Sequence, residues 1–536
     1  MDRRAFLALS GTYLLAQSRP DAPGPVVATS AGRVRGVSDS GALIFRGVPY
    51  GASTAGANRF QPPRKPAPWT GIHEATAYGP RAYQPFRPMI PEIGDALTGS
   101  GPMSEDCLRL NVFTPGTSGR RPVMVWFHGG GQRTGSGNSI FYDGRELARR
   151  HDVVVVTTTH RLNAFAYLWL AGVPGTGARF ASCANLGLRD LTLALEWVRD
   201  NISRFGGDAG RVTIFGQSGG GGKTAMLTGF PAAKGLFHRA IIMSTLAETA
   251  VTGLEPARAI EAAELLLRRL AIAPADAERL LEVPAERIVD ALAMGPDLSL
   301  RFVPVVDGTT LPAHPFSPAS PLSATVPILT GSNECEGIPY GNPDDVYWRE
   351  EPGDETALRS RVRQILPVGD DEAQRVIALY RSHRPRETPA GLAAIVAGDA
   401  SDLRQASYAI AAAKYAQGRA PVYLYRFNWR SPVRAGKLRS MHGMELPFVF
   451  DHPDLFGALT GAGEERHRLA RDMSAAWVSF ATTGNPNHAG IPRWGAWTPD
   501  RWSTMVFDSP ATAVDDPWGD ERRAIAAARR RAPRAG

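Results

Sequence analysis

Cysteine is scarce in this sequence, with only Cys107, Cys183 and Cys335 among 536 residues. Three cysteines cannot form a disulfide framework, and their spacing is not that of a metal site. The eleven histidines include no His-Glu-x-x-His motif, which is the helical pattern of many zinc hydrolases. We therefore expect no metal and no other cofactor.

Long apolar runs and concentrated positive charge are also missing. No apolar run approaches the roughly 20 residues of a membrane span, so we expect no stable membrane insertion once any export signal is removed. The formal net charge is +8, but the basic residues are dispersed, and the only dense run lies in the tail from Arg522 to Arg534. Because no basic stripe is interleaved with aromatic residues, nucleic acid is not an expected partner.

The N-terminus carries paired arginines, Arg3 and Arg4, followed by Phe6-Leu7 and a short, mildly apolar run to Ala16. This pattern is similar to a twin-arginine export signal. We predict a signal over residues 1–20 and a periplasmic or secreted protein. The alternative is an ordinary mobile N-terminus.

Continuous apolar, largely β-branched runs at 123–127 and 153–157 indicate strands buried on both faces. Strands that alternate with helical patterns predict an α/β fold with a doubly wound, mostly parallel central sheet. Two long helical stretches, near 255–295 and 355–415, are interpreted as insertions that form a lid or pocket wall. We expect residues 21–536 to form a single domain, with residues 79–103 as a loop over some feature of the surface.

The segment from Val212 to Gly220 reads as a strand, a Gly-x-Ser-x-Gly turn and the start of a helix. This order is that of a nucleophile elbow, which holds a serine hydroxyl out of the sheet toward a base. Gly216 and Gly220 lie two residues on either side of Ser218, where only small residues fit. Ser218 is therefore the candidate nucleophile.

Consecutive glycines, Gly129 to Gly131, follow the strand that ends at Phe127. Their backbone N–H groups can converge on one point, as an oxyanion hole requires. We expect the N–H groups of Gly130, Gly131 and Gly219 to form this hole. His128, beside it, is assigned a packing role.

Several motifs occur in an order that resembles one family. They are Glu105-Asp106-Cys107-Leu108, Phe127-His128-Gly129-Gly130-Gly131, Asn185-Leu186-Gly187-Leu188-Arg189-Asp190, Phe205-Gly206-Gly207-Asp208 and Phe215-Gly216-Gln217-Ser218-Gly219-Gly220. Over roughly residues 26 to 515 the chain resembles the type-B carboxylesterases, the family of the cholinesterases. The resemblance implies the α/β-hydrolase fold and a carboxylesterase that acts on small-molecule esters.

The resemblance also implies the other members of the site. Glu336 takes the place of the family's acid, with Glu334 as the competing carboxylate, and His442 takes the place of the base. Gln217 and Ser244 lie at positions that support this triad. Glu105 and Arg161 occupy places that form a buried ion pair in relatives.

The sequence departs from the family pattern at several positions. Gln217 and Gly219 replace the usual Glu and Ala. Ala82 stands where relatives have the cysteine that pairs with the equivalent of Cys107, so we expect Cys107 to be a free thiol. Neutral Gln217 is expected to leave the pocket without a buried negative charge, so that the pKa of His442 is not raised. Residues 79–105 contain no tryptophan to hold a quaternary ammonium group.

We expect hydrolysis of uncharged carboxylic esters by a Ser-His-Glu triad, through an acyl-enzyme, in a monomer or homodimer. A detoxifying or polyester-cleaving esterase on the same site is an alternative. A further alternative is a non-catalytic adhesion or binding protein of the same fold.

Overall fold

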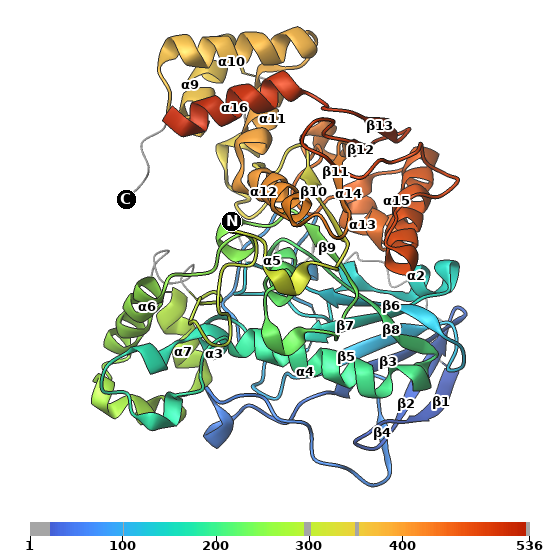
Figure 1. The fold of residues 1–536 in the computed structure, drawn as a ribbon, viewed down its shortest axis with the longest axis vertical. Helices are drawn as coiled ribbons and strands as arrows, with labels where there is room; N and C mark the ends of the chain where they lie inside the picture. The colour runs from blue at the N-terminus through green and yellow to red at the C-terminus, as the bar shows by residue number, and fades with distance from the viewer. Residues whose placement is uncertain (1–21, 100, 294–301, 349–352, 532–536) are drawn as a thin grey trace, which may run out of the picture.

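One sheet of thirteen strands organises the computed structural model, which describes residues 22–99, 101–293, 302–348 and 353–531 (Figure 1). The order across the sheet is β1-β2-β3-β5-β7-β6-β8-β9-β10-β11-β12-β13, with β4 paired to β2. The strands are β1 Ala22–Ala28, β2 Arg33–Asp39, β3 Ala42–Pro49, β4 Ile72–Glu74, β5 Arg109–Thr114, β6 Arg121–Phe127, β7 Val154–Thr159, β8 Gly207–Gln217, β9 Arg239–Met243, β10 Ile328–Asn333, β11 Val422–Phe427, β12 Thr504–Phe507 and β13 Thr512–Val514.

The strands from β7 to β12 pair in parallel, whereas β1, β2, β3 and β5 form an antiparallel edge and β13 closes the other end antiparallel. This arrangement confirms the predicted mostly parallel sheet. Because the carboxyl ends of parallel strands meet at one edge, the loops after β6, β8, β9 and β10 lie close together. That edge carries the candidate site.

The central strands are buried on both faces, as their continuous apolar runs predicted. In β6, Val123 and Val125 pack into one hydrophobic cluster, while Met124 and Trp126 pack into another. Successive side chains of a strand point to opposite faces. The two clusters are therefore the two layers of core on either side of the sheet.

Helices cover both faces. Side chains of α4, α5 and α12 contribute to the first cluster, and side chains of α2 and α15 contribute to the second. The helices are α2 Arg145–His151, α3 Asn163–Tyr167, α4 Leu186–Asn201, α5 Gly219–Thr228, α6 Pro256–Arg269, α7 Ala285–Ala293, α9 Glu355–Ile365, α10 Asp370–His383, α11 Pro389–Ala400, α12 Asp402–Gln417, α13 Leu446–Val449, α14 Gly457–Thr460, α15 Glu464–Thr483 and α16 Gly519–Arg531.

The second predicted insertion, 355–415, divides into two parts. Helices α9, α10 and α11 gather with α16 at the end of the molecule that is uppermost in Figure 1. In contrast, α12 packs on β10 and β11, and Ser407 of α12 donates a 3.0 Å hydrogen bond to the carbonyl of Gly331 in β10. This helix therefore belongs to the layer that covers the sheet.

Two expectations from the sequence concern export and membranes. The signal predicted over residues 1–20 lies outside the described residues. Within the described ranges, no helix combines the length and apolarity needed to cross a membrane.

Candidate active site

Ser218 lies at a strained turn between β8 and α5. Its backbone angles are φ 60° and ψ −127°, a conformation that non-glycine residues rarely adopt and that persists only where the surroundings enforce it. The surroundings leave little room, because a Cβ on Gly216 would lie 2.4 Å from the backbone of Gly220, and a Cβ on Gly220 would lie 1.9 Å from the carbonyl oxygen of Phe127. The turn places the half-buried Ser218 at the floor of a pocket.

The glycine loop after β6 lies directly against this turn. Gly130 and Gly131 have φ values of 94° and 63°, which favour glycine. A Cβ on Gly219 would lie 2.6 Å from the amide nitrogen of Gly131. The structure thus brings Gly131 and Gly219 together, as a shared oxyanion hole requires.

Three buried side chains hold this loop in place. Lys223 of α5 donates a 2.9 Å hydrogen bond to the carbonyl of His128. Gln132 donates a 3.1 Å hydrogen bond to the carbonyl of Gly219 and accepts one from the hydroxyl of Tyr167. Burial lowers the pKa of Lys223 to about 7.

Glu336 and His442 meet in a buried hydrogen bond of 2.6 Å between Glu336 Oε2 and His442 Nδ1. The other oxygen, Oε1, accepts hydrogen bonds from the hydroxyl of Ser244 at 2.6 Å and from the backbone N–H of Asn333 at 2.7 Å. Asn333 also donates to the carbonyl of Met441 at 2.7 Å. The loop after β10 and the histidine loop are therefore tied together, and the imidazole is oriented by a fixed carboxylate.

Glu334, the competing carboxylate, points away from His442. Its side chain is buried in an ion pair with Arg430 at 2.9 Å, and Arg426 lies 3.8 Å from its other oxygen. This geometry favours Glu336 as the acid and gives Glu334 a structural role.

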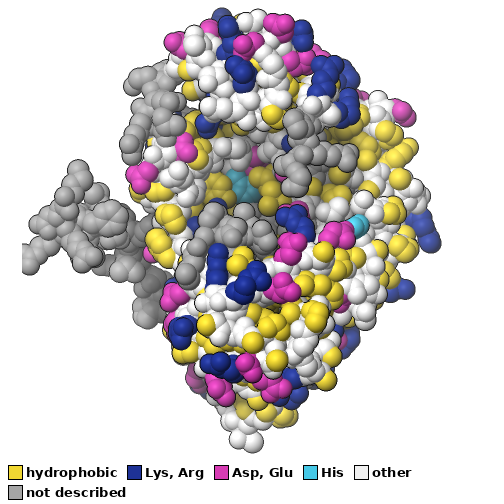
Figure 2. All heavy atoms as spheres, turned by 90° about the vertical axis from the view of Figure 1, so that its left-hand side faces the viewer, with side chains coloured by type: hydrophobic (Ala, Val, Ile, Leu, Met, Phe, Trp, Pro, Cys, Tyr) yellow, Lys and Arg dark blue, Asp and Glu magenta, His cyan; other side chains and the backbone are white. Residues whose placement is uncertain are grey.

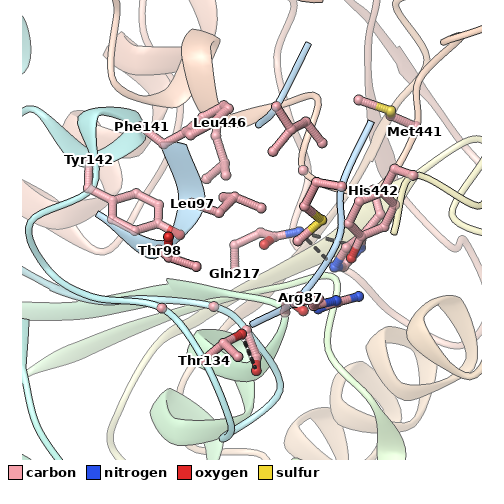
Figure 3. Close-up of a pocket in the computed structure, with 18 of the residues that line it drawn as sticks. Arg87, Leu97, Thr98, Thr134, Phe141, Tyr142, Gln217, Met441, His442 and Leu446 are labelled. Carbon is pink, nitrogen blue, oxygen red and sulfur yellow. Dashed lines mark hydrogen bonds between the residues drawn. The ribbon is translucent and has the colours of Figure 1, made fainter. Parts of the chain in front are cut away.

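Gln217 contacts the imidazole more closely than we expected from its position. Its amide nitrogen lies 3.3 Å from His442 Nε2 and 3.4 Å from Nδ1 (Figure 3). Since Nδ1 faces Glu336, the useful contact is an N–H donated to Nε2. Among the hydrogen bonds of the described residues there is none between Ser218 and His442, and such contacts often tighten only when substrate binds.

The charge around His442 corrects one expectation. Burial alone would lower the pKa of His442, but Tyr340, Glu336 and Glu445 oppose it and raise the pKa to about 9. Burial and repulsion from Glu336 raise the pKa of Glu445 to about 7. The pocket therefore does have buried carboxyl groups behind its histidine, and a neutral Gln217 does not keep the pKa of His442 low.

The pocket above Ser218 is largely apolar, with an empty volume of about 580 Å³ that includes its open mouth. In Figure 3, Leu97, Phe141, Tyr142 and Leu446 lie on one side and His442 on the other. Figure 2 shows one face of the molecule hollowed near its middle, with hydrophobic side chains and a histidine visible inside. Residues 87–98 line the pocket, so the loop predicted at 79–103 does cover a functional feature.

The two long helical stretches, expected as a lid or pocket wall, contribute none of the described residues that line this pocket. Its wall comes instead from residues 87–98, 134–142, 340 and 441–459. These segments combine loops with short helices, such as α13 and α14, and the sequence pattern did not connect them with one another.

A second correction concerns the ion pair expected from relatives. Glu105 binds Arg59 at 2.6 Å, and Arg161 binds Asp190 at 2.6 Å. Arg161 is buried and the side chain of Glu105 is 10% exposed, and each residue is paired with another partner than predicted. The three cysteines are free and buried, which confirms the free thiol of Cys107.

Sequence reasoning missed three residues that shape the site. Lys223 lies five residues after Ser218 and Glu445 three after His442, so both fall within or beside motifs already singled out. Tyr340 stacks on His442 with ring centroids 5.5 Å apart, and no sequence signal could have placed it there.

The close approach of Gly131 to Gly219 gives a testable result. Gly219→Ala would force the glycine loop to move, because its Cβ would lie 2.6 Å from the amide nitrogen of Gly131. We expect kcat for a simple ester to fall by about 10²-fold, as when one oxyanion donor is lost, with KM little changed. Steady-state kinetics would check this.

The matched control is Gly369→Ala. Gly369 precedes helix α10, outside the pocket, and a Cβ there would meet no atom within 4 Å. Unchanged kcat in Gly219→Ala would mean that the loop does not position the oxyanion donors as described.

A mostly parallel sheet whose strand ends carry a serine turn, an acid and a histidine, in that chain order, is the arrangement of the α/β-hydrolases. Solved structures similar to this one are carboxylesterases with this fold, and the protein has the α/β-hydrolase fold.

The model of the carboxylesterase family matches residues 23–524. Para-nitrobenzyl esterase of Bacillus subtilis (strain 168) is 35% identical over 511 residues, covering 93% of this chain and 98% of that protein. The structure of carboxylesterase EST55 of Geobacillus stearothermophilus matches with a TM-score of 0.77 at 35% identity, covering 93% and 99% of the two chains. An esterase from anaerobic Clostridium hathewayi that can hydrolyze aliphatic aromatic polyesters matches with a TM-score of 0.80 at 32% identity, covering 94% and 98%. The chain belongs to the carboxylesterase family and is a carboxylic ester hydrolase.

Proposed function

We propose that the protein hydrolyses uncharged carboxylic esters through an acyl-enzyme on Ser218, with His442 as general base and acid and Glu336 as its orienting carboxylate. The observation that carries the proposal is the 2.6 Å hydrogen bond between Glu336 and His442 beside a strained serine at the floor of an apolar pocket.

In the acylation step, His442 Nε2 takes the proton from the Ser218 hydroxyl while the serine oxygen attacks the ester carbonyl. The carbonyl oxygen becomes an oxyanion, which the N–H groups of Gly130, Gly131 and Gly219 stabilise. The C–O bond to the alcohol then breaks, and the alcohol leaves with the proton from His442. The Gln217 amide must turn away from His442 Nε2 for this transfer, because the single lone pair of Nε2 cannot accept from both the amide and the Ser218 hydroxyl.

In the deacylation step, water takes the place of the alcohol. His442 removes a proton from the water, whose oxygen attacks the acyl carbonyl, and the bond to Ser218 breaks as the proton returns to the serine oxygen. Glu336 stays ionised and stabilises the imidazolium in both steps. Burial raises the pKa of Glu336, but the adjacent His442 and three hydrogen bonds outweigh burial and hold it below its ordinary value.

The experiment that tests the function is a series of p-nitrophenyl esters from acetate to octanoate, assayed at several pH values. We expect turnover of the short and medium esters, with kcat/KM rising as pH rises, because neutral His442 is the active base. Absence of turnover across the whole series would reject the proposal.

Choline esters should be poorer substrates than uncharged ones. The residues that line the pocket include the cationic Arg87 and no Asp or Glu, and residues 79–105 provide no tryptophan. A quaternary ammonium group therefore gains little attraction there. We expect kcat/KM for butyrylcholine to fall below that for an uncharged butyrate ester with a leaving group of similar reactivity. Equal or faster turnover of butyrylcholine would contradict this account.

Gln217→Glu should change the pH profile. A carboxylate about 3.3 Å from His442 Nε2 would favour the imidazolium, as an opposite charge at such a distance does. We expect the rising limb of kcat/KM to move up by about one pH unit. A pH–rate profile that does not move would show that this position does not control the charge of the base.

A polyester-cleaving esterase is a second candidate. Its support is the likeness to the Clostridium hathewayi esterase together with Phe86, a residue that is 82% exposed and precedes Arg87, which lines the pocket. An exposed aromatic ring gives a flat apolar surface for a polymer chain. Release of monomers from a polyester film, lost in Phe86→Ala with p-nitrophenyl butyrate turnover retained, would favour this candidate.

A further inference from the structure

Arg87 is the charged residue of the pocket that the mechanism does not use. Of the nineteen residues that line the pocket it is the only Arg or Lys, and none of them is Asp or Glu. Among the described residues, no carboxylate forms an ion pair with Arg87. The acidic residue nearest to it in the same loop, Glu92, is bound to Arg434 at 2.5 Å.

The contacts of Arg87 with the described residues fix its position and include no hydrogen bond from its guanidinium group. Its guanidinium carbon lies 5.7 Å from the ring centroid of Tyr340, and Tyr340 in turn stacks on His442. The group also rests against Gly341, where a Cβ would approach Nη2 to 3.1 Å. A cation–π contact uses the flat face of a guanidinium, so the N–H groups at its edge can still bind an anion.

The guanidinium lies on the reactive side of the pocket. In Figure 3 it lies on the same side of the pocket as His442, while Leu97, Phe141 and Leu446 lie on the other side, and Tyr340 contacts both Arg87 and His442. A second cation is close, since burial and the charge of Arg87 lower the pKa of Arg133, whose neighbour Thr134 also lines the pocket. An apolar pocket with a positive group at one side is suited to an elongated ligand with an anionic end.

We propose that this pocket has a carboxylate subsite, in which Arg87 binds the free acid group of half-esters of dicarboxylic acids. The inference rests on the proposed function and extends its substrate range from uncharged esters to esters that carry one carboxylate. Arg87 is then a specificity-determining residue. A bidentate bond between its guanidinium edge and the carboxylate holds the scissile ester at Ser218.

Kinetic competition between matched esters tests this subsite. The anionic series is the monoethyl esters of C4, C6 and C8 dicarboxylic acids, and the neutral series is ethyl alkanoates of the same lengths. At one length or more, we expect the wild-type enzyme to prefer the anionic ester in kcat/KM. Arg87→Gln should reduce the anionic-to-neutral ratio by about tenfold, the scale of one charge-assisted hydrogen-bonded pair, and Arg87→Lys by less.

Salt and a control variant separate this role from a structural one. Added NaCl should lower the ratio for the wild-type enzyme but not for Arg87→Gln. Arg64→Gln, which removes an exposed arginine outside the pocket, should leave the ratio unchanged. An Arg87→Gln enzyme with an unchanged ratio, or equal losses on both series, would overturn the subsite.

A binding measurement tests the carboxylate subsite separately from the proposed catalytic mechanism. Calorimetric titration of the Ser218→Ala protein with monoethyl adipate requires no catalysis. We expect binding that weakens about tenfold when Arg87→Gln is added. Equal binding in the two proteins would reject the subsite, whereas ester hydrolysis that persists in Ser218→Ala would reject the mechanism and leave the subsite standing.

Discussion

Ser218→Ala is expected to lower kcat for p-nitrophenyl butyrate by about 10⁶-fold while the protein stays folded, and His442→Ala should cause a loss of the same size. The reason is that triad members act as a unit, so that removal of either one removes the covalent step. The rate that remains would come from the oxyanion donors and the binding pocket. Steady-state kinetics, together with thermal unfolding of each variant, would measure both quantities.

The matched control is Ser382→Ala, which removes an exposed hydroxyl on α10. It should match the wild type in kcat and Tm. A folded Ser218→Ala protein with near-normal kcat would remove the serine from the mechanism, and a burst of p-nitrophenol in the wild-type enzyme that is absent in the variant would support an acyl-enzyme on this residue.

The second large effect separates two carboxylates that lie two residues apart. Glu336→Gln should lower kcat by about 10⁴-fold, because an amide no longer fixes the tautomer of His442 or stabilises the imidazolium. Glu334→Gln should leave kcat within a few-fold of the wild type but lower Tm by about 2–4 °C, since Arg426 and Arg430 lose a charged partner. The expected loss is moderate because the side chain of Arg430 is 40% exposed.

Measurement of both kcat and Tm in each variant tests whether Glu336 is the acid of the triad and Glu334 a structural residue. If Glu334→Gln loses more activity than Glu336→Gln, the acid of the triad is the other carboxylate. If Glu336→Gln proves unstable, active-site titration gives kcat per folded molecule. Comparison of this kcat with that of Glu334→Gln still identifies the acid of the triad.

Local patterns predicted most of the fold and indicated Ser218 as the candidate nucleophile. Continuous apolar, largely β-branched runs indicated strands covered on both faces. The glycines on either side of Ser218 indicated a tight turn, and a Cβ on Gly216 or Gly220 would lie only 2.4 or 1.9 Å from backbone atoms. The resemblance to the carboxylesterase family then indicated Glu336 as the acid and His442 as the base, in the expected chain order. These inferences needed no knowledge of distant contacts.

The features that could not be predicted from the sequence depend on contacts between segments that are far apart in the chain. The resemblance implied an ion pair between Glu105 and Arg161, which is wrong. Their partners, Arg59 and Asp190, are decided by the packing of segments far apart in the chain. The raised pKa of His442 has in part the same origin, because Tyr340 reaches it from a distant segment of the chain. The pocket wall was missed for this reason too.

The origin of that wall has a consequence for how new specificities could arise. The groups proposed to carry out catalysis sit at strand ends that are locked by glycine contacts and by the ties between Glu336, Asn333 and the histidine loop. Residues 87–98, which lie outside the sheet, supply five of the nineteen described residues that line the pocket. Substitutions in this loop can alter which ester fits without disturbing the strand ends. A laboratory library confined to residues 87–98 would therefore sample substrate preference at little cost in folding, whereas one centred on Gly216 to Gly220 would mostly yield inactive chains.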